Sequence, residues 1–176
     1  MSRLRPVEAS EVEGVVGETL SNVPINIFKA MANNPAVMEG FLALNTAVGR
    51  SEELSGAEKE AVMLRTAERS ECGYCVAAHT KIAEGHGVGA DAALGYRNGT
   101  GSTDREKAIL TFTDAVLNRR GTVGDADVQA FRNAGFGDAA IVEVCGLIAV
   151  MAFTNTFNSV NATVVDFPAV PEAAGR

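Results

Sequence analysis

The sequence has few of the features that mark nucleic-acid-binding or secreted proteins. Lys and Arg number 15 against 22 acidic residues, for a formal net charge of -7, and no basic cluster stands out. Because nucleic-acid binding needs a basic footprint, no such partner is expected. The first residues lack the apolar segment of a signal peptide, so we expect a cytoplasmic protein.

Long hydrophobic runs and cysteines are scarce as well. The longest apolar run, Val144 to Phe153, falls short of the ~20 residues that a membrane helix needs, and it predicts a buried core helix. No membrane association is expected. Three cysteines do not suit the disulfide framework of a secreted protein. Two of them, Cys72 and Cys75, are three residues apart, which in a reducing compartment indicates redox chemistry or a metal site.

The chain also lacks the period-2 alternation of strands, and its apolar residues follow helical spacing nearly throughout. A chain of 176 residues, 47% hydrophobic and 21% charged, is long enough to bury one full core. The sequence therefore predicts a single all-α domain over residues 1–176, with about eight or nine helices in a bundle. Its core is expected within 20–165, and the tail 167–176 is expected to be frayed or to form an interface arm.

Caps and helix breakers give the expected boundaries. Ser55 and Glu58 form a capping box that begins a helix ending at Arg69. Pro35 suits the first turn of the helix that follows it. Gly85 and Gly121 suit helix ends. Helices are expected over residues 7–20, 23–32, 36–50, 55–69, 72–84, 88–95, 102–119, 126–134 and 139–160.

The residues that carry chemistry are Glu60, Cys72, Cys75 and His79. Cys75 and His79 are four residues apart, so on a helix they lie on one face. A neighbouring imidazolium or helix N-terminus lowers a thiol pKa from ~8.5 to ~3.5–7.5, and the thiolate is the nucleophile. Cys72 is one turn earlier, within reach of a disulfide, so the run supplies a nucleophile, a base and a resolving thiol. Glu60, on the preceding helix, could orient the His79 ring as a third member.

Other interpretations of these residues stay open. The cysteine pair could be half of a zinc site, completed by His79 and His86 or by a second subunit, or it could be structural. Tyr74 could wall the pocket or pack in the core, and Cys145 is expected to be buried and inert. Glu60 taken alone would more often be a solvated residue. Three asparagines could line a pocket, form an oligomer seam or face solvent: Asn155, Asn158 and Asn161.

At these residues the chain resembles the alkylhydroperoxidase D (AhpD-like) family of the carboxymuconolactone decarboxylase superfamily. The resemblance runs over about residues 20–165. It rests on Leu54-Ser55 with Glu60, on the run Cys72-Gly73-Tyr74-Cys75-Val76-Ala77-Ala78-His79, on Gly87-Val88, and on Ala134-Gly135-Phe136-Gly137-Asp138. The best-studied members have a histidine between the two cysteines, where this chain has Tyr74.

This resemblance implies an AhpD-like helical bundle that forms homo-oligomers, trimers or hexamers, and reduces hydroperoxides as a peroxiredoxin-type antioxidant enzyme. By the resemblance, Cys75 attacks the peroxide and becomes a sulfenic acid, His79 relays a proton with help from Glu60, and Cys72 closes the disulfide. It implies no metal and no organic cofactor. Electrons come from an external thiol reductant. Decarboxylation is not expected, since the decarboxylase branch typically lacks the cysteine pair.

Peroxide reduction is accordingly our first hypothesis for this chain. The second is a general thiol-disulfide oxidoreductase or redox sensor with a disulfide substrate and little peroxidase turnover. The third is a non-catalytic, metal-binding helical oligomer.

Overall fold

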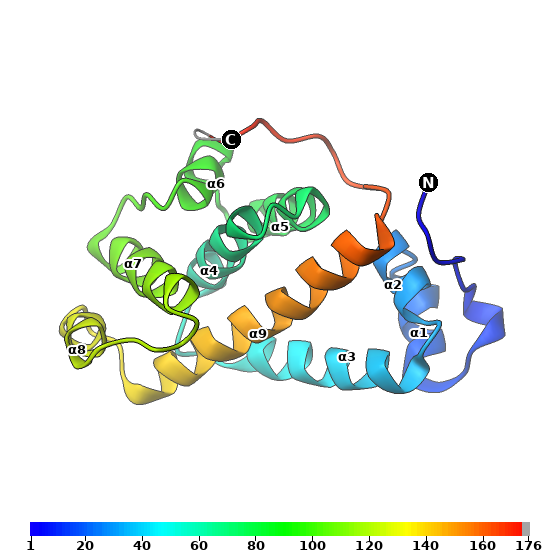
Figure 1. The fold of residues 1–176 in the computed structure, drawn as a ribbon, viewed down its shortest axis with the longest axis horizontal. Helices are drawn as coiled ribbons and strands as arrows, with labels where there is room; N and C mark the ends of the chain where they lie inside the picture. The colour runs from blue at the N-terminus through cyan, green and yellow to red at the C-terminus, as the bar shows by residue number, and fades with distance from the viewer. Residues whose placement is uncertain (174–176) are drawn as a thin grey trace.

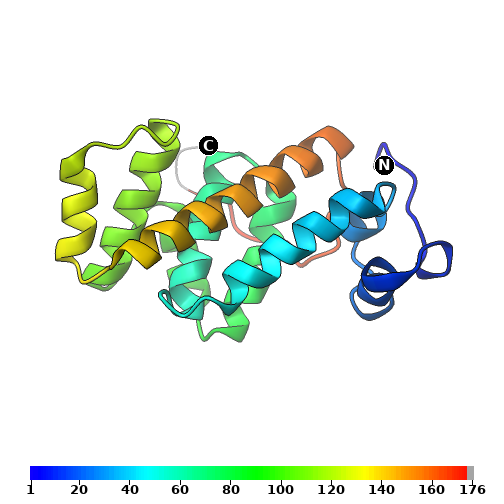
Figure 2. The ribbon, with the colours of Figure 1, turned by 90° about the horizontal axis from the view of Figure 1, so that it is seen from below.

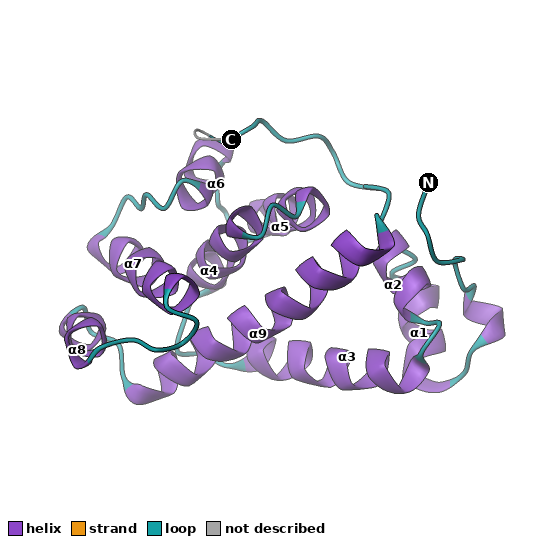
Figure 3. Ribbon diagram, viewed as in Figure 1, coloured by secondary structure: helices purple, strands orange, loops and turns teal. Residues whose placement is uncertain are grey.

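The computed structural model describes residues 1–173, which form helices and no strand (Figure 3). The all-α prediction is therefore confirmed. Within the described residues the elements are η1 (Ala9–Glu11), α1 (Gly14–Asn22), α2 (Asn26–Met31), α3 (Pro35–Arg50), α4 (Gly56–Arg69), α5 (Gly73–Gly85), α6 (Ala90–Arg97), α7 (Asp104–Asn118), α8 (Asp125–Asn133) and α9 (Asp138–Asn161).

Helix α9 crosses the whole molecule and packs against α3, α4 and α5 (Figure 1). Figure 2 shows α3 running alongside it in the opposite direction. The two helices pack closely at Gly146, where an added Cβ would lie 2.7 Å from Val48 Cγ1. A side chain at this position would push α3 away, so glycine permits the close packing.

By length and composition alone, α9 is apolar enough to cross a membrane, and within the described residues no other helix meets that test. Its position in the fold is that of a core helix. Val144, Leu147 and Met151 are fully buried in the protein, and the polar residues Glu143 and Asn158 are buried beside them. The helix is longer than the apolar run, and towards its C-terminal end the buried residues include the asparagines Asn155, Asn158 and Asn161.

Helices α4 and α5 form a hairpin whose geometry places the cysteines. The predicted capping box is present, with the Ser55 side chain accepting from the Glu58 N–H. At the other end of α4, the N–H of Cys72 donates to the Ala67 carbonyl at 3.1 Å and the N–H of Glu71 donates to Glu68 at 3.0 Å. This is a Schellman motif, which requires a left-handed residue. Glu71 fills that position at φ 53°, so the last turn of α4 leads directly into the cysteine motif.

The predicted first helix over 7–20 is wrong at its start. Only a short 3-10 turn forms at Ala9–Glu11, Val12 is extended, and α1 begins at Gly14, whose φ is +63°. The extended Val12 and the positive φ of Gly14 interrupt the helical conformation, so the apolar spacing on either side does not make one helix. The other predicted helices agree with the structure to within two residues at each end, except that α2 begins three residues later than predicted.

Part of the segment expected to form a tail lies against the domain. Residues 164–173 run back across α5 towards α6 (Figure 1). The Arg97 guanidinium donates to the Pro171 carbonyl at 2.7 Å, the Phe167 ring packs edge-on against Tyr74, and Ala173 is buried. These contacts fold the segment onto the domain. The rest of the predicted tail, 174–176, lies outside the described residues.

Candidate active site

The cysteine pair lies at the N-terminus of α5. Cys72 is the N-cap residue, and its Sγ accepts a hydrogen bond from the Cys75 backbone N–H at 3.3 Å. Both cysteines are free thiols and both are buried. The interaction with the Cys75 thiol, aided by the Cys75 and Tyr74 backbone N–H groups, lowers the pKa of Cys72 to about 7 in spite of burial. A helix N-terminus favours such a thiolate.

Cys75 has the opposite electrostatic environment. The interaction with Cys72, followed by burial, raises the pKa of its thiol. The two sulfurs therefore share one proton near neutral pH, with the negative charge mainly on Cys72. Helix α9 partly offsets this effect, because Asn158 Nδ2 donates to Cys75 Sγ at 3.2 Å and the Thr154 hydroxyl also interacts with Cys75.

Glu60 and His79 face each other across the hairpin of α4 and α5. His79 Nδ1 lies 2.9 Å from Glu60 Oε2, and the exposed fractions of the two side chains are 17% and 6%. The nearly buried carboxylate orients the ring and accepts a hydrogen bond from Nδ1 in the tautomer that has Nδ1 protonated. The other ring nitrogen, Nε2, is left for a ligand or a proton.

A cavity of about 130 Å³ connects His79 with Cys75. Its wall is mainly apolar, with Ile27, Phe28, Phe41, Ala78 and Val150 from four helices and Phe167 from the C-terminal segment. A larger depression of about 710 Å³ lies on the other side of His79, and both spaces are bordered by Asn45, His79 and Ile82. The imidazole therefore borders both the apolar cavity at the sulfur and a wider depression that has more polar residues in its wall.

Within the described residues, no hydrogen bond joins the His79 ring to either sulfur. The two groups meet through the cavity that they both line. In this arrangement the reacting group of a substrate, or a water molecule, would stand between the sulfur and the ring. Catalytic hydrogen bonds are often formed only when the substrate is bound.

The structure separates the remaining candidates. His86 lies at the end of α5 against Gly56, on the wall of the larger depression, and the described residues contain no cluster of three or more potential metal ligands. The prediction that Cys145 is buried is wrong: it is exposed on α9, because it lies on the face turned away from the core. The three asparagines are all buried, but only Asn158 contacts a cysteine.

Two functional candidates were missed by sequence reasoning. Thr154 lies four residues before Asn158, so both face Cys75 from one side of α9, and this i, i+4 spacing was a usable signal. Phe167 comes from the segment interpreted as a tail, and nothing in the local sequence indicates that it returns to the cysteines.

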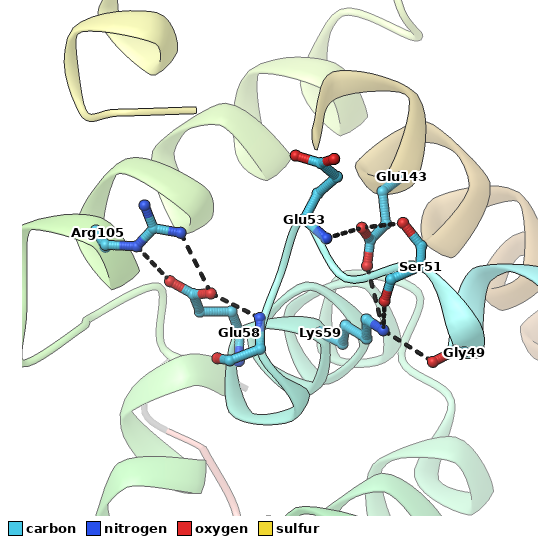
Figure 4. Close-up of polar contacts among 8 residues, drawn as sticks. Gly49, Ser51, Glu53, Glu58, Lys59, Arg105 and Glu143 are labelled. Carbon is cyan, nitrogen blue, oxygen red and sulfur yellow. Dashed lines mark hydrogen bonds and ion pairs between the residues drawn. The ribbon is translucent and has the colours of Figure 1, made fainter. Parts of the chain in front are cut away.

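Adjacent to Glu60 on α4, Lys59 belongs to a separate polar cluster (Figure 4). Its ammonium donates to the Gly49 carbonyl at 2.9 Å and to the Ser51 carbonyl, and lies 3.4 Å from Glu143 Oε1. The other carboxylate oxygen of Glu143 accepts from the Ser51 hydroxyl at 2.5 Å and from the Glu53 N–H at 3.2 Å. This cluster ties the end of α3 to α4 and α9.

Comparison with known proteins places these features in a class. Residues 35–95, which include all four predicted site residues, match the model of the carboxymuconolactone decarboxylase family. No curated protein sequence matches the chain. The segment that carries the predicted site is thus similar to this family, and the fold of the chain is AhpD-like.

Solved structures share the fold at low sequence identity. An alkylhydroperoxidase AhpD core protein from Ralstonia eutropha JMP134, an uncharacterized peroxidase-related protein, is 22% identical with a TM-score of 0.85 over 94% of this chain and 92% of that one. The debrominase Bmp8, a cysteine-to-alanine variant in complex with 2,3,4-tribromopyrrole, is 18% identical with a TM-score of 0.75 over 94% and 92%. A protein of unknown function from Agrobacterium tumefaciens, named as a candidate AhpD antioxidant defence protein, is 22% identical with a TM-score of 0.70 over 78% and 95%.

Proposed function

We propose that the protein is a thiol-dependent peroxidase that reduces hydroperoxides through a dithiol-disulfide cycle at Cys72 and Cys75. The observation that carries the proposal is the shared cavity. Cys75 and His79 line one mainly apolar space, and Glu60 binds the Nδ1 side of the His79 ring. A nucleophile, an oriented acid-base group and a resolving thiol are thereby brought around one site for a small substrate.

Cys75 is the sulfur proposed to attack, because it faces the cavity while Cys72 does not line it. The lower pKa favours Cys72 as the nucleophile, whereas access to the cavity favours Cys75. The proton that the two sulfurs share moves to Cys72, which leaves the thiolate on Cys75 when the peroxide arrives. Asn158 and Thr154 stabilise that charge from α9.

In the first step, the Cys75 thiolate attacks one peroxide oxygen and the O–O bond breaks. The leaving alkoxide takes a proton from the His79 imidazolium and departs as an alcohol, and Cys75 becomes a sulfenic acid. In the second step, the Cys72 sulfur attacks the Cys75 sulfur, the S–O bond breaks, and water leaves. An external dithiol then reduces the disulfide by exchange and supplies the two electrons that the peroxide consumed.

Turnover with a hydroperoxide and a dithiol reductant tests this proposal. Peroxide consumption should be lost in Cys75→Ser and retained in Cys145→Ser, which removes the exposed thiol outside the site. Equal turnover in Cys75→Ser and the wild type would refute the assigned role.

A general thiol-disulfide oxidoreductase is the second candidate, and the pKa of Cys72 favours it. A value of about 7 matches that of thioredoxin's Cys-X-X-Cys thiol, about 7. Fast reaction with a model disulfide beside negligible peroxide turnover would select this function. Since one fold hosts different reactions, the same assay should include 2,3,4-tribromopyrrole, the compound bound to the debrominase of this fold.

We also propose a cytoplasmic homo-oligomer, a trimer or hexamer, with neither metal nor organic cofactor. The outward face of α9 supports association, because Val142 and Val160 are 71% and 61% exposed there. The free thiols suit a reducing compartment. Light scattering would measure the subunit number, and a monomer at working concentration would contradict the assembly.

A further inference from the structure

The C-terminal segment forms part of the cavity that holds Cys75. Phe167 is the residue through which it does so, and the ring contacts Tyr74 edge-on with 5.5 Å between centroids. All other residues of that wall come from helices or from the turn before α2. The segment therefore completes a wall of the space at Cys75 that the helices otherwise form.

Specific polar contacts hold this segment in place. The Asp166 carboxylate accepts from the Asn26 N–H at 2.7 Å, and the Val164 carbonyl accepts from the Asn26 side chain at 2.9 Å. Beyond Phe167, Arg97 binds the Pro171 carbonyl at 2.7 Å and is itself paired with Glu68. Phe167 is thus anchored on both sides along the chain.

Tyr74 links this anchor to the cysteines. It lies between Cys72 and Cys75 in the sequence, its hydroxyl accepts from the Ile27 N–H at 3.3 Å, and its ring packs on Phe167. Burial, followed by the neighbouring Asp166 carboxylate, raises the pKa of Tyr74, so the hydroxyl stays neutral. Tyr74 therefore belongs to the helix that carries Cys75 and packs against the C-terminal segment.

We propose that Phe167 is a specificity-determining residue that limits the size of the molecule reaching Cys75. The inference rests on the proposed function for its substrate, but the closure of the cavity can be tested without turnover. An apolar protein cavity of about 150 Å³ binds benzene. The 130 Å³ space at Cys75 therefore admits a short alkyl group and excludes an aryl group that carries a further branched chain.

The test compares a small and a bulky thiol reagent on reduced protein in a Cys145→Ser background. Iodoacetamide and N-phenylmaleimide are applied separately, and the labelled cysteine is located by mass spectrometry. In Phe167→Ala the rate at Cys75 with the maleimide, relative to iodoacetamide, should rise about tenfold or more, the range of one or two buried methylene groups. Phe167→Trp should lower the same ratio. Phe157→Ala is the matched control, since Phe157 is a partly buried ring on α9 that does not line the cavity.

A second readout uses substrates. The ratio of kcat/KM for cumene hydroperoxide to that for tert-butyl hydroperoxide should rise in Phe167→Ala and not in Phe157→Ala. An unchanged reagent ratio in both Phe167 variants, with their circular dichroism intact, would overturn the proposal. If the reagent ratio responds but no variant consumes peroxide, the size limit stands and the peroxidase function fails, so the two failures can be distinguished.

Discussion

Lys59 and Glu60 are neighbours on α4, yet their surroundings differ in kind. Lys59 has three oxygen partners, and its buried counter-ion Glu143 is bound by Ser51 and Glu53 as well (Figure 4). Among the described residues Glu60 binds His79, whose side chain lines a cavity. A polar cluster in which nearly every group is bound stabilises the fold. A polar pair whose imidazole lines a cavity is available for chemistry.

The largest effect is expected from substitutions in the pair formed by Glu60 and His79. His79→Ala should lower kcat/KM for a hydroperoxide by about 10²–10⁴-fold, the usual contribution of a general acid-base group. Glu60→Gln should lower it less and keep the ring in place. Both variants should melt close to the wild-type temperature. Steady-state kinetics and thermal unfolding measured on the same samples check this separation, and a large drop in Tm with full activity would contradict it.

Substitutions in the cluster of Lys59 and Glu143 should instead lower stability. Glu143→Ala removes a carboxylate that is 1% exposed and leaves Lys59 without its counter-ion, so the free energy of unfolding should fall by about 3 kcal/mol. Replacing both partners, as in Lys59→Met with Glu143→Leu, should restore most of the loss, since well-packed apolar residues often replace a buried pair without cost. Urea titration measures this. No recovery in the double variant would show that Lys59 and Glu143 act independently.

The two cysteines extend the comparison to a pair that shares one proton. Alkylation of Cys72 should follow its thiolate, slow below and fast above an apparent pKa of about 7. In Cys75→Ala that pKa should rise, because the interaction with the Cys75 thiol is the largest cause of its depression. The pH dependence of iodoacetamide labelling in a Cys145→Ser background measures both values. An unchanged pKa would contradict the shared proton.

The smallest effect is expected at Glu71, in the turn that joins α4 to α5. Glu71 has a left-handed conformation, which costs a non-glycine residue roughly 1–2 kcal/mol. Glu71→Gly should therefore raise the free energy of unfolding by about 1 kcal/mol or less, since glycine also loses more backbone entropy on folding. Peroxide turnover should not change, because Glu71 is exposed and its side chain is absent from the cavity wall. A loss of turnover would show that this turn sets the positions of the thiols.

Much of the fold was predictable because local signals determine it. Ser55 with Glu58 begins α4 and Pro35 begins α3, as the capping rules require. Helix α5 ends at Gly85 as expected, but the left-handed glycine that follows it is Gly87. The prediction of the first helix was wrong at its start, because Gly14 adopts a positive φ that apolar spacing does not reveal. The prediction that Cys145 is buried was wrong, because an apolar run does not reveal which helix face is exposed.

Some residues of the candidate site could likewise be predicted from the sequence, and others could not. Cys72, Cys75 and His79 share one helix, so their proximity follows from spacing. Glu60 was a plausible partner, and the structure places it 2.9 Å from His79. Asn158 reaches Cys75, and Phe167 reaches the cavity, only through tertiary packing. They lie 83 and 92 residues after Cys75 in the sequence. Contacts over such separations carry no local signal.

Trapping of the first oxidised product tests the central claim most directly. Cys72→Ser protein, which lacks the resolving thiol, is treated with one equivalent of hydroperoxide in the presence of dimedone, and the modified residue is located by mass spectrometry. We predict a sulfenic acid adduct on Cys75. Consumption of the peroxide while Cys75 remains an unmodified thiol would contradict the account.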